Sequence, residues 1–298
     1  MNYLRFPRSI LAALLATLGG TAANAEPAKV DISQDPNVLQ FRAWQEANSL
    51  PAVALVADGE APRTAGGSRI GGYVWLPDGE TWPLDREGKP MVFLAQVDFG
   101  ELPPLPDYPT SGALQFFISR TGDLYGMDFE KPENGDFRVI YRESLSGQGR
   151  LEVGSTKGVQ KFDDYTPIFP ETIAKGVRLV PFATSHKPST DSWLMERDVE
   201  HLPPSNEREA WDRIYAYAGE VSLEDGFGQS RVGGHPEFTQ SDWRIRPEYQ
   251  DVDRVLLQLW TDDRNMMWGD SGQGQFLIRR EDLLKRDFSK VFYQWDCY

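Results

Sequence analysis

The sequence predicts an α+β protein that is mainly antiparallel β-sheet, built from two duplicated β-rich halves with a few peripheral helices. Three observations lead to this class: segments repeat about 160 residues apart, apolar runs of strand length lie between glycine turns, and helical periodicity is confined to a few segments. Each half is short for a core of its own, and no Gly/Ser linker separates the two. We therefore expect residues 26–298 to form a single domain.

The repeat consists of three pairs of segments in the same order. Each segment returns 160 to 162 positions later: Ser68–Gly72 as Ser230–Gly234, Phe93–Val97 as Leu256–Leu259, and Ser111–Ile118 as Ser271–Ile278. The paired glycines supply the positive φ angles that tight turns need, and the apolar runs suit strands covered on both faces. These pairs place one half at about residues 52–160 and the other at about 205–298.

Helices are predicted at three places outside these strands. Asp35 followed by Pro36 predicts a capped helix start, residues 211–218 have apolar side chains at helical spacing, and a short helix is expected near Glu281–Arg286. The two halves are joined by a Pro-rich connection, about residues 147–204, which has no copy elsewhere and contains one predicted strand, Val177–Phe182.

The first 25 residues are predicted to be a signal peptide. Arg5 and Arg8 precede the apolar stretch Ile10–Leu18, and small residues close the segment at Ala23–Ala25. Cleavage there would leave Glu26 as the first residue of a secreted or periplasmic protein, with no membrane insertion after signal cleavage. The alternative is that the segment stays on the protein as an amphipathic or core helix.

The charge balance limits the classes of partner. The chain has a net charge of −14, and removal of the signal peptide takes away two arginines and no acidic residue, which makes it −16. Nucleic-acid binding depends on basic side chains that displace counterions, so we expect no nucleic-acid partner. A cationic protein is the partner class that the charge favours. Because Cys297 is the only cysteine, no intramolecular disulfide can form.

Several segments together are similar to the YwqG family, a family of domains of unknown function. They are Ser68–Gly72, Trp82–Pro83, Gly88–Met91, Phe93–Phe99, Gly112–Ile118 and Phe137–Tyr141 in the first half, and Gly233–Pro236, Phe238–Gln240, Leu256–Gln258, Trp268–Asp270 and Phe288–Tyr298 in the second. The resemblance covers roughly Ala52 to Tyr298. It implies an α+β fold with internal duplication and no established activity. The chain departs from the family pattern in its export signal and at Tyr73–Val74, where a proline is more usual.

Familiar catalytic and cofactor patterns are poorly matched. Gly269–Gly272 is similar to the turn around a protease serine, but His186, His201 and His235 lack the flanking pattern of a catalytic base. No His/Cys pair has zinc-site spacing, no glycine pattern marks a nucleotide site, and Asp262–Asn265 is explained more simply as a polar turn than as part of a calcium site. We therefore expect no metal and no cofactor.

The polar residues that recur in both halves are the candidate binding residues. They are Arg69 with Arg231, Gln96 with Gln258, and Gln115 with Gln275. A glutamine within an apolar strand must be hydrogen-bonded, so the first interpretation is that these residues tie their turns to the sheet. The second interpretation is that they line a ligand groove between the halves. Trp268 and Asp270 are further candidates for ligand or partner binding.

Two function classes remain open at this stage, so whether the protein is an enzyme is undecided. The leading hypothesis is a non-catalytic binding protein of the cell envelope that neutralises a basic effector or toxin, because acidic surfaces steer cationic partners. The alternative is an envelope hydrolase that acts on glycan or peptidoglycan with carboxylates such as Asp270 beside Trp268. A pocket with two converging carboxylates would favour the hydrolase.

Overall fold

The structure is a computed structural model that describes residues 31–154, 166–198, 208–221 and 228–298. The predicted signal peptide, residues 1–25, lies outside the described residues, as does His201. The strands are β1 (Leu50–Glu60), β2 (Arg69–Ile70), β3 (Tyr73–Pro77), β4 (Val92–Asp98), β5 (Ala113–Ile118), β6 (Phe137–Arg142), β7 (Gly149–Val153), β8 (Val177–His186), β9 (Arg231–Gly233), β10 (Arg254–Trp260), β11 (Gln273–Ile278) and β12 (Phe292–Asp296).

Helices are short and few beside these strands. The α-helices are α1 (Pro36–Ala47), α2 (Pro170–Lys175), α3 (Trp193–Asp198), α4 (Arg208–Val221) and α5 (Arg280–Lys285), and the 3-10 helices are η1 (Ile32–Gln34), η2 (Pro132–Asn134), η4 (Trp243–Ile245), η5 (Pro247–Tyr249) and η6 (Phe288–Lys290). The structure agrees with the predicted α+β class with a mainly antiparallel sheet. No helix in the described parts of the chain has the length and apolar character needed to cross a membrane.

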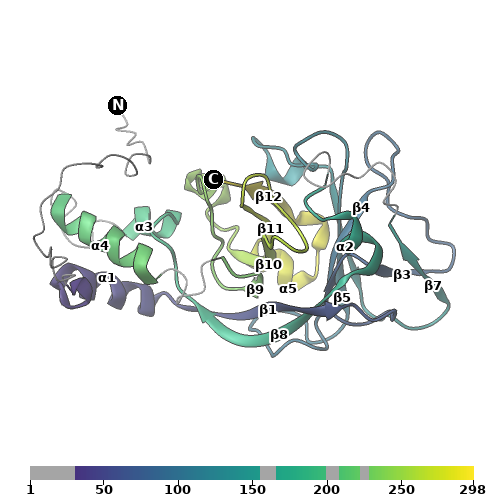
Figure 1. Cartoon of the computed structure of the whole chain (residues 1–298), viewed down its shortest axis with the longest axis horizontal. Coiled ribbons are helices and arrows are strands. Elements are labelled where there is room, and N and C mark those ends of the chain that lie inside the picture. The colour runs from purple at the N-terminus through teal and green to yellow at the C-terminus, as the bar shows by residue number, and fades with distance from the viewer. Residues whose placement is uncertain (1–30, 155–165, 199–207, 222–227) are drawn as a thin grey trace, which may run out of the picture.

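Ten strands form one antiparallel sheet in the order β12-β11-β10-β9-β1-β8-β2-β4-β5-β6, and β3 pairs with β7 in a separate two-stranded sheet. The long strands β1 and β8 are the two middle strands of this order, and they run side by side along the lower side of the molecule in Figure 1. β1 pairs with β9, which lies far along the chain, while β8 pairs with β2. The remaining strands form two groups of four: β2, β4, β5 and β6, which follow β1 in the sequence, and β9 to β12, which follow β8. Each group pairs with the strand that precedes the other group, so neither group is an independent domain.

The two groups of four strands have matching registers. β4 is interrupted by a bulge between Phe93 and Ala95 where it pairs with β5, and β10 has a bulge between Val255 and Leu257 where it pairs with β11. These bulges lie 162 positions apart, which is the offset of the sequence repeat. The predicted strand pairs thus occupy corresponding places in the sheet.

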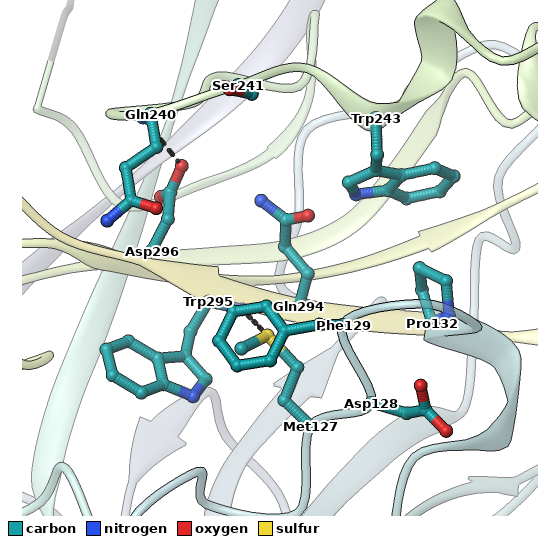
Figure 2. Close-up of a pocket in the computed structure, with 10 residues that line it drawn as sticks. All are labelled: Met127, Asp128, Phe129, Pro132, Gln240, Ser241, Trp243, Gln294, Trp295 and Asp296. Carbon is teal, nitrogen blue, oxygen red and sulfur yellow. Dashed lines mark hydrogen bonds between the residues drawn. The ribbon is translucent and has the colours of Figure 1, made fainter.

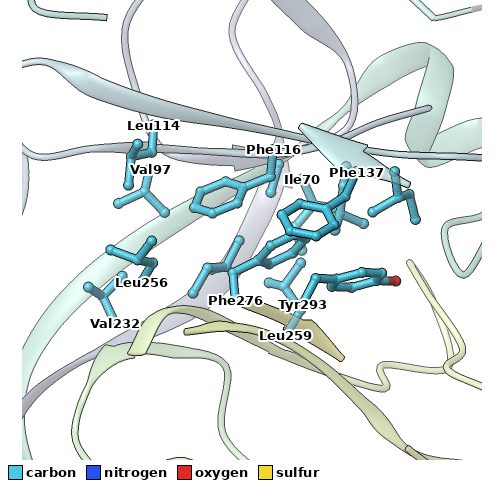
Figure 3. Packing of buried hydrophobic residues seen from close by; sticks show 14 of the residues in the cluster. Ile70, Val97, Leu114, Phe116, Phe137, Val232, Leu256, Leu259, Phe276 and Tyr293 are labelled. Atoms are coloured by element: carbon cyan, nitrogen blue, oxygen red, sulfur yellow. The ribbon is translucent and has the colours of Figure 1, made fainter. Parts of the chain in front are cut away.

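The main hydrophobic core lies where the two groups of strands face each other (Figure 3). Phe116 of β5 and Phe276 of β11 are far apart in strand order, yet their ring centroids are 4.8 Å apart. Phe137 of β6 packs against Tyr293 of β12 with centroids 5.4 Å apart. The sheet is therefore strongly curved, with apolar side chains filling its inner face.

Helices α1, α3 and α4 group at one end of the molecule, beside the ends of β1 and β8 (Figure 1). The Asp35 side chain accepts from the backbone N–H of Asn37 at 2.9 Å, so the predicted cap begins α1. The predicted helices at residues 211–218 and 281–286 correspond to α4 and α5.

The Pro-rich connection contributes more to the fold than the sequence predicts. The expected strand at Val177–Phe182 is present as β8, but it extends to His186 and lies in the middle of the large sheet. Its pairing with β1 along nearly its whole length explains why this segment needs no copy in either half.

Candidate functional site

Two matching rows of polar side chains cross the sheet, one in each group of four strands. The registers place Arg69 opposite Gln96 and Gln96 opposite Gln115 in the first row, and Arg231 opposite Gln258 and Gln258 opposite Gln275 in the second. All six side chains are buried. Because a buried polar atom without a hydrogen bond is costly, the partners of each row indicate its role.

Arg69 holds together the loop that precedes β2. Its Nη1 donates to the carbonyl of Thr64 at 2.9 Å and to those of Pro62 and Tyr73 at 3.2 Å, and its Nε donates to the carbonyl of Gly67 at 3.2 Å. The fixed fork of donors on a guanidinium suits this task. Arg69 is thus buried and bonded to backbone carbonyls, in agreement with the first interpretation of the recurring polar residues, that they tie their turns to the sheet.

The glutamines of the first row complete the same network. Gln96 Nε2 donates to the carbonyl of Ala65 at 3.0 Å, and Gln115 Nε2 donates to the carbonyl of Trp75 at 3.0 Å and to Gln96 Oε1 at 3.2 Å. Gln115 Oε1 accepts from Arg142 Nε at 2.9 Å. Every side-chain nitrogen and oxygen of the first row thus has a partner, which indicates an architectural role.

The second row is organised around Glu237, a buried carboxylate in the loop after β9. Glu237 Oε2 accepts from Arg231 Nη1 and from Gln258 Nε2, both at 2.9 Å, and its Oε1 lies 3.1 Å from His186 Nε2. The backbone carbonyl of Glu237 accepts from Gln275 Nε2 at 2.9 Å. Arg231 is therefore buried in an ion pair with a carboxylate, whereas Arg69 donates to backbone carbonyls.

Two histidines border this cluster. The backbone N–H of His235 donates to His186 Nδ1 at 3.2 Å, so His186 carries its proton on Nε2 and donates to Glu237. His235 Nε2 donates to the carbonyl of Asn48 at 2.6 Å, and burial lowers the pKa of His235 to about 3. Both ring nitrogens of His186 are thus engaged, and the low pKa of His235 keeps its side chain neutral at pH 7.

Glu237 stays charged despite its burial. Burial by itself raises the pKa of a carboxyl group, but here the charge of Arg231 and the hydrogen bond from His186 outweigh it and lower the pKa of Glu237 to about 2. The cluster is a permanently ionised pair at neutral pH.

The second row differs from the first in how completely its atoms are paired. Arg231 Nε, Gln258 Oε1, Gln275 Oε1, both amide atoms of Gln273 and Asp296 Oδ1 are buried with no hydrogen-bond partner among the residues that the structure describes. Unsatisfied buried groups are rare in folded proteins, and each indicates strain, a bound water or a ligand site. They lie along β9, β10, β11 and β12.

A pocket of about 180 Å³ lies at the β12 end of this row (Figure 2). Its floor is β12, and its walls come from the loop after β9, from η4 and from the segment before η2. The residues that line it are Met127, Asp128, Phe129, Pro132, Gln240, Ser241, Trp243, Gln294, Trp295 and Asp296. The pocket therefore combines aromatic rings with carboxylates and amides.

Asp296 is the carboxyl group of the pocket whose pKa is shifted by its surroundings. Its Oδ2 accepts from the backbone N–H groups of Thr239 at 2.7 Å and Gln240 at 3.2 Å. The Thr239 hydroxyl and the Gln273 amide lie beside the carboxylate and favour its charged form, but neither reaches Oδ1 in hydrogen-bonding geometry. Burial outweighs these contacts and raises the pKa of Asp296 to about 6.

Two tryptophans give the pocket its aromatic surface. Trp295 Nε1 donates to the carbonyl of Leu124 at 2.8 Å, which fixes its ring, and Trp268 packs behind it with centroids 6.4 Å apart. Trp243 is held by stacking on Phe292 at 5.9 Å, and its Nε1 is buried with no partner in the described ranges. Figure 2 shows Trp243 and Asp296 at opposite ends of the pocket with Gln294 between them.

The candidate residues from the sequence fall into separate places. Arg69 lies beside Gln96 in the first row, and Arg231 lies beside Gln258 in the second. Each pair is covered by its own loop. Trp268 is fully buried and supports Trp295 from inside, while Asp270 is exposed in the turn before β11.

The protease-like turn does not acquire a catalytic base. Ser271 Oγ has the sulfur of Met267 at 4.0 Å as its contact, and both nitrogens of His186 are engaged elsewhere. His186 is the last residue of β8, and its Nε2 contacts the carboxylate of Glu237. Within the described ranges, no cluster of three or more histidine, cysteine or acidic side chains could hold a metal ion.

Sequence reasoning did not identify Glu237, His186 or Asp296 as candidate site residues. Glu237 and His186 come from a loop and a strand end that the repeat does not include. Asp296 could have been found had a strand been predicted near the C-terminus, because Gln294 and Asp296 are two positions apart in β12 and so face the same side of the sheet as Gln275.

Comparison with known proteins identifies the family. The family model described as a domain of unknown function (DUF1963) matches residues 68–297. No curated protein matches the chain significantly.

Proposed function

Because the chain belongs to the DUF1963 family, whose description names no activity, we propose a function from the site itself: the protein is a non-catalytic binding protein that holds part of its partner in the Asp296 pocket. The observation that carries this proposal is the buried Asp296 Oδ1, which has no hydrogen-bond partner among the described residues and lies in an aromatic pocket. Small-molecule and side-chain sites are typically concave and apolar, with few convergent polar groups.

Comparison of the two rows supports a binding role for the second half. Asp296 lies opposite Gln273, where the first half has Arg142 opposite Ala113. Arg142 is fully paired, since its Nη1 donates to Glu80 Oε2 at 2.8 Å. The same place in the sheet is therefore closed in the first half and carries unpaired groups in the second.

We also propose that the chain arose by internal duplication and that it is a YwqG-like member of the wider family. The matching registers and bulges support an internal duplication in which one half kept an architectural role and the other gained a pocket. The segments named above also support a YwqG-like protein within the wider family. We infer an envelope location from the predicted signal peptide and a basic partner, such as an effector or toxin, from the net charge of −14.

A glycan or peptidoglycan hydrolase is the second candidate, since the pocket also contains a second carboxylate, Asp128. Its Oδ1 accepts from the backbone N–H groups of Glu130 at 3.0 Å and Lys131 at 2.9 Å, so it serves as a turn cap. A hydrolase needs one carboxyl group as acid and another as base or nucleophile. The original pair for this hypothesis, Trp268 with Asp270, is divided between the core and the surface.

The proposed function is tested by affinity capture from envelope extract. The purified chain is compared with Asp296→Asn and with the matched control Asp270→Asn, which removes the same charge from an exposed turn. We expect the wild type and the control to retain the same basic protein, and Asp296→Asn to lose it. Equal capture by all three proteins, or release of new reducing ends from peptidoglycan, would contradict a binding role for the pocket.

A further inference from the structure

We propose that the Asp296 pocket receives a lysine side chain of the partner, with the primary ammonium at the carboxylate and the alkyl stem between the aromatic rings. This inference rests on the proposed binding function and names the chemical group that the site recognises. It is carried by four features of the pocket: its open carboxylate oxygen, its aromatic walls, its size and its second polar end.

The carboxylate offers a single open oxygen. Asp296 Oδ2 already accepts from two backbone N–H groups, while Oδ1 is buried without a partner in the part of the chain that the structure describes. Asp296 is 7% exposed, so a cation that reaches it must leave water. A guanidinium binds best to both oxygens of a carboxylate, whereas an ammonium is a compact point charge. The geometry therefore favours lysine over arginine.

Two neighbouring side chains favour the form of this carboxylate that a cation needs. The Thr239 hydroxyl and the Gln273 amide lie beside Asp296 and favour its charged form, and within the described ranges neither reaches Oδ1 in hydrogen-bonding geometry. An ammonium carries three donors and no acceptor. Asp296 Oδ1 accepts one of these donors, and the opposite charges offset part of the cost of removing the ammonium from water.

The walls suit an alkyl chain. The fixed rings of Trp243 and Trp295 line the pocket, and Phe129, which is 63% exposed, lies beside them. Aromatic faces attract cations and pack well against methylene groups. The volume of about 180 Å³ is below the roughly 300–1,000 Å³ of sites for drug-sized ligands. One amino-acid side chain fits this size better than an oligosaccharide does.

The far end of the pocket matches the backbone of the same residue. Trp243 Nε1, a donor with no partner among the residues that the structure describes, lies at the opposite end from Asp296 (Figure 2). A lysine whose ammonium lies at Asp296 would direct its own peptide carbonyl toward this end. The site thus distinguishes a lysine within a polypeptide from a free cation.

The test uses four small probes and the purified chain. They are the N-methylamides of Nα-acetyl-lysine, Nα-acetyl-arginine and Nα-acetyl-norleucine, together with N-acetylglucosamine. Binding at pH 7.5 is followed through the indole N–H resonances of Trp243 and Trp295 in ¹⁵N-labelled protein. We expect the lysine probe to shift both resonances saturably, and to bind at least about tenfold more weakly to Asp296→Asn but equally to Asp270→Asn.

The controls separate this inference from the proposed function. The norleucine probe has a similar stem without the charge, so it should bind at least about tenfold more weakly than lysine to the wild type. Equal binding of lysine and norleucine, or of lysine and arginine, overturns the ammonium assignment, as does a saturable shift with N-acetylglucosamine alone. If envelope capture depends on Asp296 while the lysine probe fails, this inference is wrong and the binding function stands. If capture is also indifferent to Asp296, both are wrong.

Discussion

Replacement of Arg231 by alanine should reveal how the second half is held together. Arg231 Nη1 lies 2.9 Å from Glu237 Oε2, and both side chains are almost fully buried. Loss of one partner from a buried pair costs about 3 to 5 kcal/mol, because the other charge stays buried without compensation. We expect Arg231→Ala to lower the free energy of unfolding at pH 7 by this amount.

A double-mutant cycle isolates the ion pair from the loss of packing. Glu237→Gln removes the charge and keeps the shape, so the double variant should be about 1 to 3 kcal/mol more stable than the sum of the two single effects predicts. Arg69→Ala is the matched control, because Arg69 donates to backbone carbonyls. Its effect should simply add to that of Glu237→Gln.

Urea denaturation followed by tryptophan fluorescence measures these free energies. Coupling between Arg231→Ala and Glu237→Gln, with additivity for Arg69→Ala, supports the assignment of an ionised cluster in the second half and a carbonyl network in the first. Additivity within about 0.5 kcal/mol for both arginines would refute it.

Three further predictions concern pH and packing. The pKa of Asp296 is raised from 3.8 to about 6, so the contribution of this carboxyl group to stability is present below pH 3.8 and is lost as pH rises through 6; Asp296→Asn should be more stable than wild type by up to about 3 kcal/mol at pH 7.5 and similar to it at pH 4, by urea denaturation. The pKa of His235 is lowered from 6.5 to about 3, so its contribution to stability is complete above pH 6.5 and falls by about 1.4 kcal/mol per unit below it. Because the two contributions oppose each other between these pH values, the slope from His235 is measured in the Asp296→Asn background; adding His235→Gln should flatten it, and an unchanged slope would contradict neutral burial. A Cβ at Gly274 would lie 2.3 Å from the Trp268 ring, which is fully buried, so Gly274→Ala should cost about 1 to 3 kcal/mol and weaken binding of the lysine probe; unchanged thermal midpoint and binding would show that the ring can move.

Much of the fold was predictable because local patterns and tertiary packing agree. The apolar runs around Gln96 and Gln258 are strands, and Asp35 caps a helix where the pattern indicates. The central role of β8 was not predictable, since pairing between strands far apart in sequence depends on the sheet as a whole. A single sequence shows that Val177–Phe182 is apolar, but not which strands it joins.

The candidate site was predictable only in part. Repetition identified Arg231 and Gln258, which do lie together in a polar cluster. It could not identify Glu237 or Asp296, because features unique to one half are invisible to a search for similarity between halves. The proposed binding pocket lies in the half that contains these unmatched residues.

The pKa of the Asp296 carboxyl group in the presence of the lysine probe tests the central claim most directly. By linkage, a ligand that prefers the charged carboxylate tenfold lowers its pKa by one unit when the ligand is saturating. Carboxyl ¹³C NMR should therefore show a pKa of about 6 in the free protein and a value at least about one unit lower with the lysine probe bound. A pKa that is the same with and without the saturating probe would contradict contact between the ammonium and Asp296.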